Sequence, residues 1–363
     1  MDIKLKSIFL SVAWSISSFA VLAQNDKSPA PITIQEQGSF MVGGTTIATA
    51  GKFEFAHYRN PEGQKAYADH AYAFYQIPVN AKKLPLVFLH GGGQSGKTWE
   101  TTPDGREGFQ NIFLRRGYSC YVVDQPRRGR AGSTSKTTTV SPSFTNQMLF
   151  SLFRIGNYPN LFPGTQFPQD TESIEQLLRW ATPDTGPYDD EVTAEAMKAL
   201  FDKVGQAILV THSRGGYPGW LTALKTSNVK AIVSFEPGGG EYVFPFPEGE
   251  VPEPLKTSYG LHQGQSIPLE EFEKFTQIPI IIYYGDFIAE KPTPHIGQDQ
   301  WRGELQMAKA FVEAVNRHGG NAQVIHLPEI GIKGNTHFPM SDLNNIEIAD
   351  LMELWLHEKG LSK

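Results

Sequence analysis

The 363-residue sequence contains a single cysteine, Cys120, and its formal net charge at pH 7 is -6. One cysteine excludes an internal disulfide, so the folded chain must rely on its core for stability. A net negative charge provides no broad basic surface for nucleic acid and favours a small-molecule partner. Hydrophobic residues make up 40% of the chain and charged residues 19%, a composition that is ordinary for a globular protein and argues against disorder.

Long apolar runs are also scarce, and the one candidate lies at the N-terminus. Lys4 and Lys6 precede a mostly apolar, serine-interrupted stretch at residues 7–23, and polar residues follow it. This pattern predicts a secretory signal peptide over residues 1–23, with cleavage after Ala23. The alternative is a membrane anchor, for which the stretch is too short. No later stretch is apolar enough to span a bilayer, so we expect a periplasmic or secreted mature chain with no membrane span.

Residues 207–216, Ala-Ile-Leu-Val-Thr-His-Ser-Arg-Gly-Gly, predict a strand, a sharp turn and the start of a helix. Such a turn lifts the hydroxyl of Ser213 clear of the sheet edge, and Gly215 and Gly216 allow the strand and the helix to pack closely. The nucleophile elbow of serine hydrolases has this form. Its usual pattern is Gly-x-Ser-x-Gly, and Thr211 here replaces the first glycine. The alternative is an ordinary turn that happens to contain serine.

Apolar segments alternate with helical ones from residue 84 onward, which predicts an α/β fold with a mainly parallel central sheet covered by helices. The expected strands are 85–89, 118–123, 207–210, 230–235, 279–284 and 323–327. The expected helices are 108–116, 217–225, 300–318 and 345–359. Residues 39–50 and 71–78 have the alternation of antiparallel strands. These elements predict one domain over residues 24–363, with Cys120 packed in its core.

The interval 135–205 interrupts this alternation and is too long for a plain connection. It contains two helical segments, 171–181 and 191–204, and six aromatic residues: Phe144, Phe150, Phe153, Tyr158, Phe162 and Phe167. We expect a cap insertion over about residues 135–205, whose aromatic residues either line a ligand pocket or form a small core of their own. A second interval, 238–271, is rich in proline, glycine and acidic residues, which predicts a surface loop.

A glycine loop follows the first expected parallel strand. Residues 91–98, Gly-Gly-Gly-Gln-Ser-Gly-Lys-Thr, satisfy the Walker A pattern. A phosphate loop needs a helix that begins at its Lys-Thr pair, but a proline and a glycine follow within two turns. We therefore favour an oxyanion loop at residues 90–93, because glycines allow backbone amides to approach a negative oxygen. One amide would come from Gly92, with Gly93 as a further candidate, and the other from Arg214.

A serine hydroxyl is a weak nucleophile until a histidine takes its proton. His337 is the best candidate, because it lies in a glycine-bearing loop between the last expected strand and the C-terminal helix. His326 lies within a strand and His212 adjoins the serine, so both fit less well. Two carboxylates compete to orient the histidine, because Glu236 and Asp286 each end a strand. The chain order serine, acid, histidine does not separate them.

Four segments together resemble the secreted bacterial esterases of the Alcaligenes type, which belong to the α/β-hydrolase superfamily. They are the elbow, Ala-Ile-Val-Ser-Phe-Glu-Pro-Gly at 231–238, Asp-Gln-Pro-Arg-Arg-Gly at 124–129 and Gly-Asn-Thr-His at 334–337. The similarity extends from the glycine loop to the C-terminus and is weakest in the insertion. In that family the glutamate of the Glu-Pro-Gly turn is the acid. The resemblance therefore implies Glu236 and leaves Asp286 a supporting role.

These residues predict a serine esterase that forms an acyl-enzyme. Ser213 would attack the ester carbonyl, His337 would act as base and then acid, and Glu236 would hold the imidazolium, while the Gly92 and Arg214 amides bind the oxyanion. No metal and no cofactor are implied. The alternatives are a non-catalytic ligand-binding protein on the same scaffold, and cleavage of an amide, lactone or carbon–carbon bond by the same groups.

The expected partner is a small-molecule ester, and a homodimer is left open. Arg127, Arg128 and Arg130 follow an expected parallel strand at the sheet edge where ligands of such folds bind. Either they form a solvated loop, or one of them receives an anionic group of the substrate.

Overall fold

The computed structural model describes residues 30–140 and 146–363. The chain separates into two units, Met1–Pro31 and Ile32–Lys363, and all named helices and strands belong to the second unit. The expected signal peptide, residues 1–23, and the aromatic residue Phe144 lie outside the described residues.

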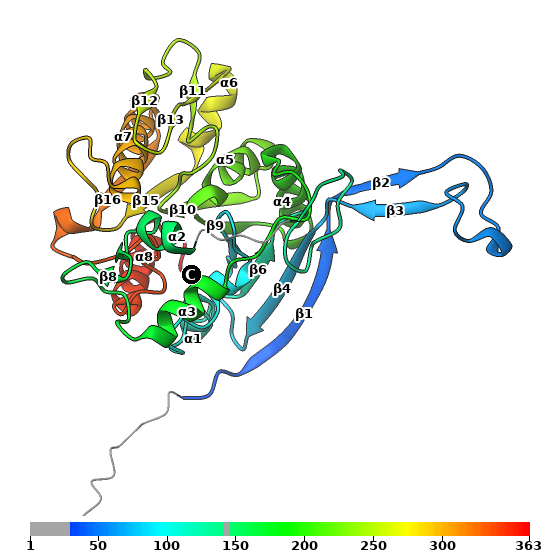
Figure 1. Cartoon of the computed structure of the whole chain (residues 1–363), viewed down its shortest axis with the longest axis horizontal. Helices are drawn as coiled ribbons and strands as arrows, with labels where there is room; N and C mark the ends of the chain where they lie inside the picture. Colours follow the sequence, from blue (N-terminus) through cyan, green and yellow to red (C-terminus); the bar gives the residue numbers. More distant parts are fainter. Residues whose placement is uncertain (1–29, 141–145) are drawn as a thin grey trace, which may run out of the picture. The chain divides into compact units, whose positions relative to one another are not determined.

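An eight-stranded sheet passes through the second unit in the order β1-β4-β6-β5-β9-β10-β15-β16 (Figure 1). β1 (Ile34–Val42) and β4 (Ala71–Pro78) are antiparallel, and β4 pairs antiparallel with β6. The other six strands are parallel: β6 (Cys120–Asp124), β5 (Leu86–Leu89), β9 (Ala207–His212), β10 (Val229–Phe235), β15 (Pro279–Tyr284) and β16 (Asn321–His326). The predicted mainly parallel sheet is therefore confirmed.

Helices cover both faces of this sheet. α4 (Asp190–Val204), α5 (Gly216–Lys225) and α7 (Ile296–Arg317) contribute to one buried cluster, and α1 (Phe109–Arg115) and α8 (Asn345–Glu358) contribute to the other. Because successive strand residues point to opposite faces, Val87 and Leu89 of β5 join the first cluster, whereas Leu86 and Phe88 join the second. Cys120 is buried in the second cluster, as its expected core position requires.

Residues 39–50, predicted to form antiparallel strand structure around a glycine pair, divide at that pair, and only the first part joins the central sheet. β1 ends at Val42, and β2 (Thr45–Ala48) pairs instead with β3 (Lys65–Ala68) in a hairpin that projects from the sheet (Figure 1). Gly43 and Gly44 separate the two strands, with φ angles of +70° and +87°. Such left-handed backbone ends the extended conformation.

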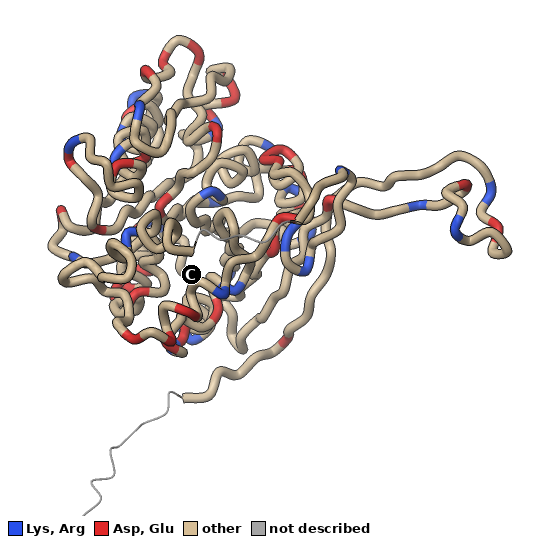
Figure 2. Tube along the Cα trace, viewed as in Figure 1, with Lys and Arg blue, Asp and Glu red and all other residues tan. Residues whose placement is uncertain are grey.

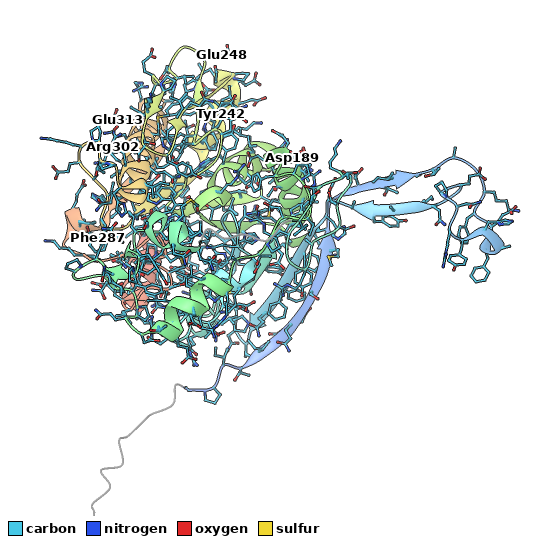
Figure 3. The ribbon with its side chains drawn as sticks, in the orientation of Figure 1. Asp189, Tyr242, Glu248, Phe287, Arg302 and Glu313 are labelled. Carbon is cyan, nitrogen blue, oxygen red and sulfur yellow. The ribbon has the colours of Figure 1, made fainter. Side chains whose placement is uncertain are left out.

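The prediction of a surface loop over residues 238–271 is also wrong. Val243, Phe244 and Phe246 are buried in the core cluster that contains α5 and α7, whereas Glu248 at the outer end of the segment is exposed (Figure 3). The segment forms β11 (Pro245–Pro247), β12 (Leu255–Lys256), β13 (Leu261–His262), β14 (Gln265–Ile267) and the start of α6 (Leu269–Phe272). Phe244 and Phe246 are each followed by a proline, and proline argues against a strand within a sheet, so the sequence favoured a loop.

The two parts of the interval predicted as a cap insertion, residues 135–205, have different positions in the fold. α4, its last helix, packs on the sheet with α5 as part of the covering layer. The preceding elements are α2 (Asn146–Leu152), β7 (Gly156–Asn157), β8 (Asn160–Leu161) and α3 (Thr171–Arg179), and α2 packs against α7. Short 3-10 helices complete the unit: η1 (Phe55–His57), η2 (Gly96–Trp99), η3 (Ser213–Gly215), η4 (Glu273–Gln277) and η5 (Leu327–Ile330).

Basic and acidic residues are interspersed along the chain (Figure 2). Among the described residues, no helix combines the length and the apolar character needed to cross a membrane.

Thr211, at the position where a glycine is usual, is accommodated by a glycine on the facing helix. Its hydroxyl hydrogen bonds to the Ser234 hydroxyl of the neighbouring strand at 2.7 Å. A Cβ on Gly219 of α5 would lie 2.7 Å from the Thr211 Cγ2 methyl, a separation that real Cβ atoms do not adopt. The close approach of β9 and α5 therefore depends on Gly219 together with Thr211.

Gly219→Ala should destabilise the protein because its methyl group overlaps that of Thr211. Overpacking costs about 1–3 kcal/mol, and the helix propensity of alanine offsets about 1 kcal/mol of it. In a Thr211→Ser background, which keeps the hydroxyl and removes the methyl group, the same change should stabilise the protein. Denaturant unfolding of the wild type, the two single variants and the double variant measures both effects. Equal effects of Gly219→Ala in the two backgrounds would contradict this packing.

Candidate active site

Three of the predicted site residues meet at the carboxyl ends of neighbouring parallel strands. Ser213 follows β9, Glu236 follows β10, and His337 lies in the loop between β16 and α8. The Nε2 atom of His337 is 2.9 Å from Ser213 Oγ, and its Nδ1 atom is 3.2 Å from Glu236 Oε2. The structure thus brings together a hydroxyl, an imidazole and a carboxylate in one hydrogen-bonded chain.

The backbone at Ser213 has the sharp conformation that the elbow prediction requires. Its φ angle is +53°, in the left-handed region that a non-glycine residue rarely adopts. A Cβ on Gly91 would lie 2.7 Å from Ser213 Cβ, and a Cβ on Gly216 would lie 2.7 Å from Pro237 Cβ. Glycine at these positions therefore allows the glycine loop and the turn after β10 to approach the elbow closely.

Glu236 is fully buried and also adopts a left-handed conformation, with φ at +53°. Its Oε1 atom accepts hydrogen bonds from Nη2 of Arg154, at 2.6 Å, and from the amide of Gly285. Burial by itself would raise the pKa of this carboxyl. The charge of Arg154 and the hydrogen bonds from His337 and Arg154 outweigh burial and lower the pKa of Glu236 to about 2. The carboxylate is therefore ionised at neutral pH.

The imidazole of His337 is held by hydrogen bonds and by aromatic rings. Trp301 and Phe153 both stack on it, with ring centroids 4.3 and 5.4 Å away. Burial lowers the pKa of His337 and outweighs the opposite effect of Glu236, so the ring is neutral at pH 7. An ionised carboxylate only accepts, so Nδ1–H donates to Glu236 and Nε2 is left to accept from the Ser213 hydroxyl.

Asp286, the competing acid, faces the backbone of the histidine loop. Its carboxylate accepts from the amides of Phe287 and Gly334, at 2.6 and 2.7 Å. Its own amide donates to the carbonyl of Asn335 at 2.7 Å. No hydrogen bond joins it to the His337 ring among the described residues. Asp286 therefore holds the loop that carries the histidine, whereas Glu236 contacts the histidine itself.

The glycine loop lies against the elbow and is fixed by the segment after β6. Gln125 donates its amide to His90 Nε2 at 3.1 Å and its side chain to the His90 carbonyl, while Arg128 Nη1 donates to the Gly91 carbonyl at 3.2 Å. A Cβ on Gly92 would lie 3.3 Å from Cδ of Arg214. The two predicted oxyanion donors, the amides of Gly92 and Arg214, therefore belong to segments that face each other.

Comparison with known proteins agrees with this fold. Residues 86–342 match the model of a family described as the alpha/beta hydrolase family. The chain belongs to the α/β-hydrolase family. A solved structure described as a novel bacterial esterase is 30% identical, with a TM-score of 0.71, over 91% of this chain and 97% of that one. A protein named "Probable secreted lipase phiG", from Fungal sp. (strain ATCC 74256), is 27% identical over 321 residues, 78% of this chain and 84% of its own.

The Walker A pattern does not form a phosphate loop in this hydrolase. Its Lys-Thr pair lies in η2, a four-residue 3-10 helix, where a phosphate loop would need the start of an α-helix. The Lys97 amine lies over the Trp180 ring, 4.6 Å from the centroid, and donates to the carbonyl of Thr101. The phosphate-loop alternative is thus disfavoured, and the oxyanion loop at residues 90–93 stays a prediction.

The three arginines after β6 are each paired with a carboxylate of the hydrolase. Arg127 contacts Asp69 at 2.8 Å, Arg128 contacts Asp184, and Arg130 contacts Asp124 at 2.8 Å. Arg127 and Arg128 are also buried. The prediction that one of the three receives an anionic substrate group does not fit these pairings.

A cavity of about 740 Å³ adjoins the glycine loop at Gly92 and Gly93. Its apolar lining includes Leu149 and Phe153 from α2 and the segment after it, and Leu177, Leu178, Ala181 and Pro183 from α3 and the segment after it. The insertion therefore lines a pocket that adjoins the predicted oxyanion loop. Its aromatic residues divide between two roles, because Phe153 lines this pocket whereas Phe150 and Phe167 are buried in the core.

Two other insertion aromatics have different surroundings. Phe162 packs against Phe287, with ring centroids 4.8 Å apart. Phe287 is labelled in Figure 3. Tyr158 is half exposed.

Arg154 and Trp301 are the site residues that the sequence reasoning did not identify. Arg154 is the one charged residue in the sequence Phe-Ser-Leu-Phe-Arg-Ile at 150–155, a pattern that could have indicated a buried ion pair. Trp301 carries no comparable signal, because it is one of several large residues in a long amphipathic helix. Within residues 30–140 and 146–363, no three His, Cys, Asp or Glu side chains are arranged to hold a metal ion.

Proposed function

We propose that this α/β hydrolase is an exported serine esterase that uses Ser213, His337 and Glu236. The observation that carries the proposal is the hydrogen-bonded chain from Ser213 Oγ through neutral His337 to ionised Glu236. A hydroxyl, a base poised to accept its proton and a charged group that stabilises the resulting imidazolium are the requirements of nucleophilic acyl transfer. The largely apolar cavity that adjoins the glycine loop offers room for an acyl or alkyl group.

The proposed reaction has two acyl-transfer steps. His337 Nε2 takes the proton of Ser213 while Oγ bonds to the ester carbonyl carbon, and the amides of Gly92 and Arg214 stabilise the oxyanion. Collapse of this intermediate breaks the bond to the alcohol oxygen, which receives the proton from His337. A water molecule then attacks the acyl-enzyme, with His337 again taking and returning a proton, and the carboxylic acid is released.

The choice of an ester substrate is supported by the relatives and by the cavity. The solved relative is described as an esterase and the fungal relative is named a lipase. The pocket lining is largely apolar, which suits acyl and alkyl chains.

Glu236→Gln should lower kcat by up to ~10⁴ at neutral pH, because the amide cannot stabilise the imidazolium and can favour the wrong tautomer. Asp286→Asn should lower kcat far less, because Asp286 contacts loop amides and not the ring. Steady-state kinetics on one activated ester compares the two variants.

Glu236→Gln also leaves Arg154 as an unpaired buried cation, which costs about 3–5 kcal/mol of stability. The double variant Glu236→Gln/Arg154→Met removes that cation and separates loss of catalysis from loss of folding. Circular dichroism and unfolding midpoints identify the folded variants. A crippled Asp286→Asn enzyme beside a near-wild-type Glu236→Gln enzyme would show that the proposed acid is wrong.

Export is proposed from the N-terminal sequence and is supported by the word "secreted" in the name of the fungal relative. We expect signal peptidase to remove residues 1–23, so that the exported protein begins at Gln24. Intact mass measurement of the exported protein tests this expectation. An exported protein that retains Met1 would contradict the proposed cleavage.

A further inference from the structure

The peptide that joins Gly91 to Gly92 has two partners on its carbonyl side and none on its amide side. The Gly91 carbonyl oxygen lies 2.8 Å from Nδ1 of His90 and 3.2 Å from Nη1 of Arg128. Among residues 30–140 and 146–363, no protein group accepts a hydrogen bond from the Gly92 amide. Gly92 lines the cavity of about 740 Å³. An uncommitted N–H donor is therefore available at a residue that lines the cavity.

His90 donates to the Gly91 carbonyl as a neutral ring. The ring is fully buried, and burial together with the charge of Arg128 lowers the pKa of His90 to about 4. Nε2 accepts from the Gln125 amide at 3.1 Å, so the ring hydrogen is on Nδ1 and is donated to the Gly91 carbonyl. The carbonyl thus receives one neutral donor, from His90, and one charged donor, from Arg128.

Arg128 is held in one orientation by a carboxylate on its other edge. Nε donates to Oδ1 of Asp184 at 2.8 Å, and Nη2 donates to the same oxygen. These bonds use one edge of the planar guanidinium and leave Nη1 for the Gly91 carbonyl. The Arg128 side chain is 2% exposed, whereas that of Asp184 is 40% exposed. Because water screens the carboxylate, it only partly cancels the field of the guanidinium at the buried peptide.

A charge at one end of a peptide acts on both ends. The C=O and N–H of a trans peptide lie in one plane and point in opposite directions, so donors that fix the Gly91 carbonyl also fix the direction of the Gly92 N–H. A charged donor on the carbonyl withdraws electron density through the delocalised C–N bond, which makes the N–H a stronger donor. Donors that are fixed in advance stabilise an oxyanion without a cost of reorganisation.

We propose that Arg128 is a positioning residue for the oxyanion hole: through the Gly91 carbonyl it orients and polarises the Gly91–Gly92 peptide, so that the Gly92 amide binds the negative oxygen more strongly. The proposal rests on the esterase function proposed above and adds a residue to its oxyanion hole. It assigns Arg128 to stabilisation of the transition state and not to recognition of an anionic substrate.

Arg128→Met tests the proposal, because it removes the charge and keeps a long side chain. The variant should fold, since Asp184 is left partly in water and His90 still donates to the Gly91 carbonyl. We expect kcat on an activated ester to fall roughly 5- to 50-fold with little change in KM. This loss is smaller than the roughly 100- to 1000-fold loss that follows removal of a whole oxyanion donor.

A transition-state analogue supplies a readout that a purely structural role would not move. A trifluoromethyl ketone bonds to the serine hydroxyl and places its oxygen as an oxyanion, so its Ki should rise by the factor by which kcat/KM falls. Titration of active sites with a fluorophosphonate corrects both values for inactive protein. Arg128→Lys keeps the charge without the planar fork, and it should lie between wild type and Arg128→Met in both measurements.

Arg130→Met is the matched control. Arg130 belongs to the same segment after β6 and pairs with Asp124 at 2.8 Å. Among the described residues, no hydrogen bond joins its side chain to Gly91 or Gly92. The control should leave both kcat/KM and the Ki of the ketone unchanged.

Wild-type values of kcat/KM and Ki in Arg128→Met would overturn the proposal and leave the esterase function intact. A fall in kcat/KM without a rise in Ki, or equal changes in Arg130→Met, would overturn it as well. A wild-type protein that is folded but neither hydrolyses esters nor binds the ketone would instead contradict the esterase function, and this role of Arg128 with it.

Discussion

The buried carboxylate of Glu236 is the constraint on which the site depends. Its charge is compensated by Arg154 from the insertion, by the Gly285 amide after β15 and by His337 from the loop after β16. Removing one partner of a buried ion pair costs several kcal/mol, so these segments must be in place for the fold to be stable. The same contacts that stabilise the carboxylate therefore position the histidine beside Ser213. Folding of the insertion and assembly of the site are coupled through Arg154.

The site also concentrates unfavourable backbone conformations at one edge of the sheet. Ser213, Glu236 and Phe287 follow the neighbouring strands β9, β10 and β15, and all three have positive φ angles without being glycine. Such residues cost of order 1–3 kcal/mol each and persist only where the surroundings impose them. Here the surroundings include glycines of the facing loops and buried hydrogen bonds. The strain directs the serine and glutamate side chains toward the same histidine.

Much of this arrangement could be predicted from the order of residues along the chain. Buried parallel strands appear as short apolar runs, and the position of His337 after the last strand follows from the need for a base near Ser213. The choice between Glu236 and Asp286 could not be made from chain order, because both end strands between serine and histidine. The choice depends on the contacts of each carboxylate in the folded protein. The Asp286 carboxylate accepts hydrogen bonds from the backbone amides of Phe287 and Gly334.

Other features could not be predicted because they depend on contacts between distant segments. Arg154 lies 82 positions before its partner Glu236, and neither local sequence indicates the other. Thr211 departs from the usual elbow pattern, and the compensating glycine lies on the next helix. The buried Phe244 and Phe246 are each followed by a proline, and proline argues against a strand within a sheet, so the sequence did not indicate their burial.

The central claim is that Ser213 is the nucleophile of an acyl-transfer reaction, and covalent labelling tests it most directly. Wild-type protein treated with a fluorophosphonate should gain one adduct, which peptide mass spectrometry should locate on Ser213, and ester hydrolysis should stop in proportion to labelling. Ser213→Ala, which removes only the hydroxyl, should remain folded by circular dichroism, take up no label and hydrolyse no ester. Labelling of the Ser213→Ala protein at the wild-type rate, or retained hydrolysis, would contradict the account.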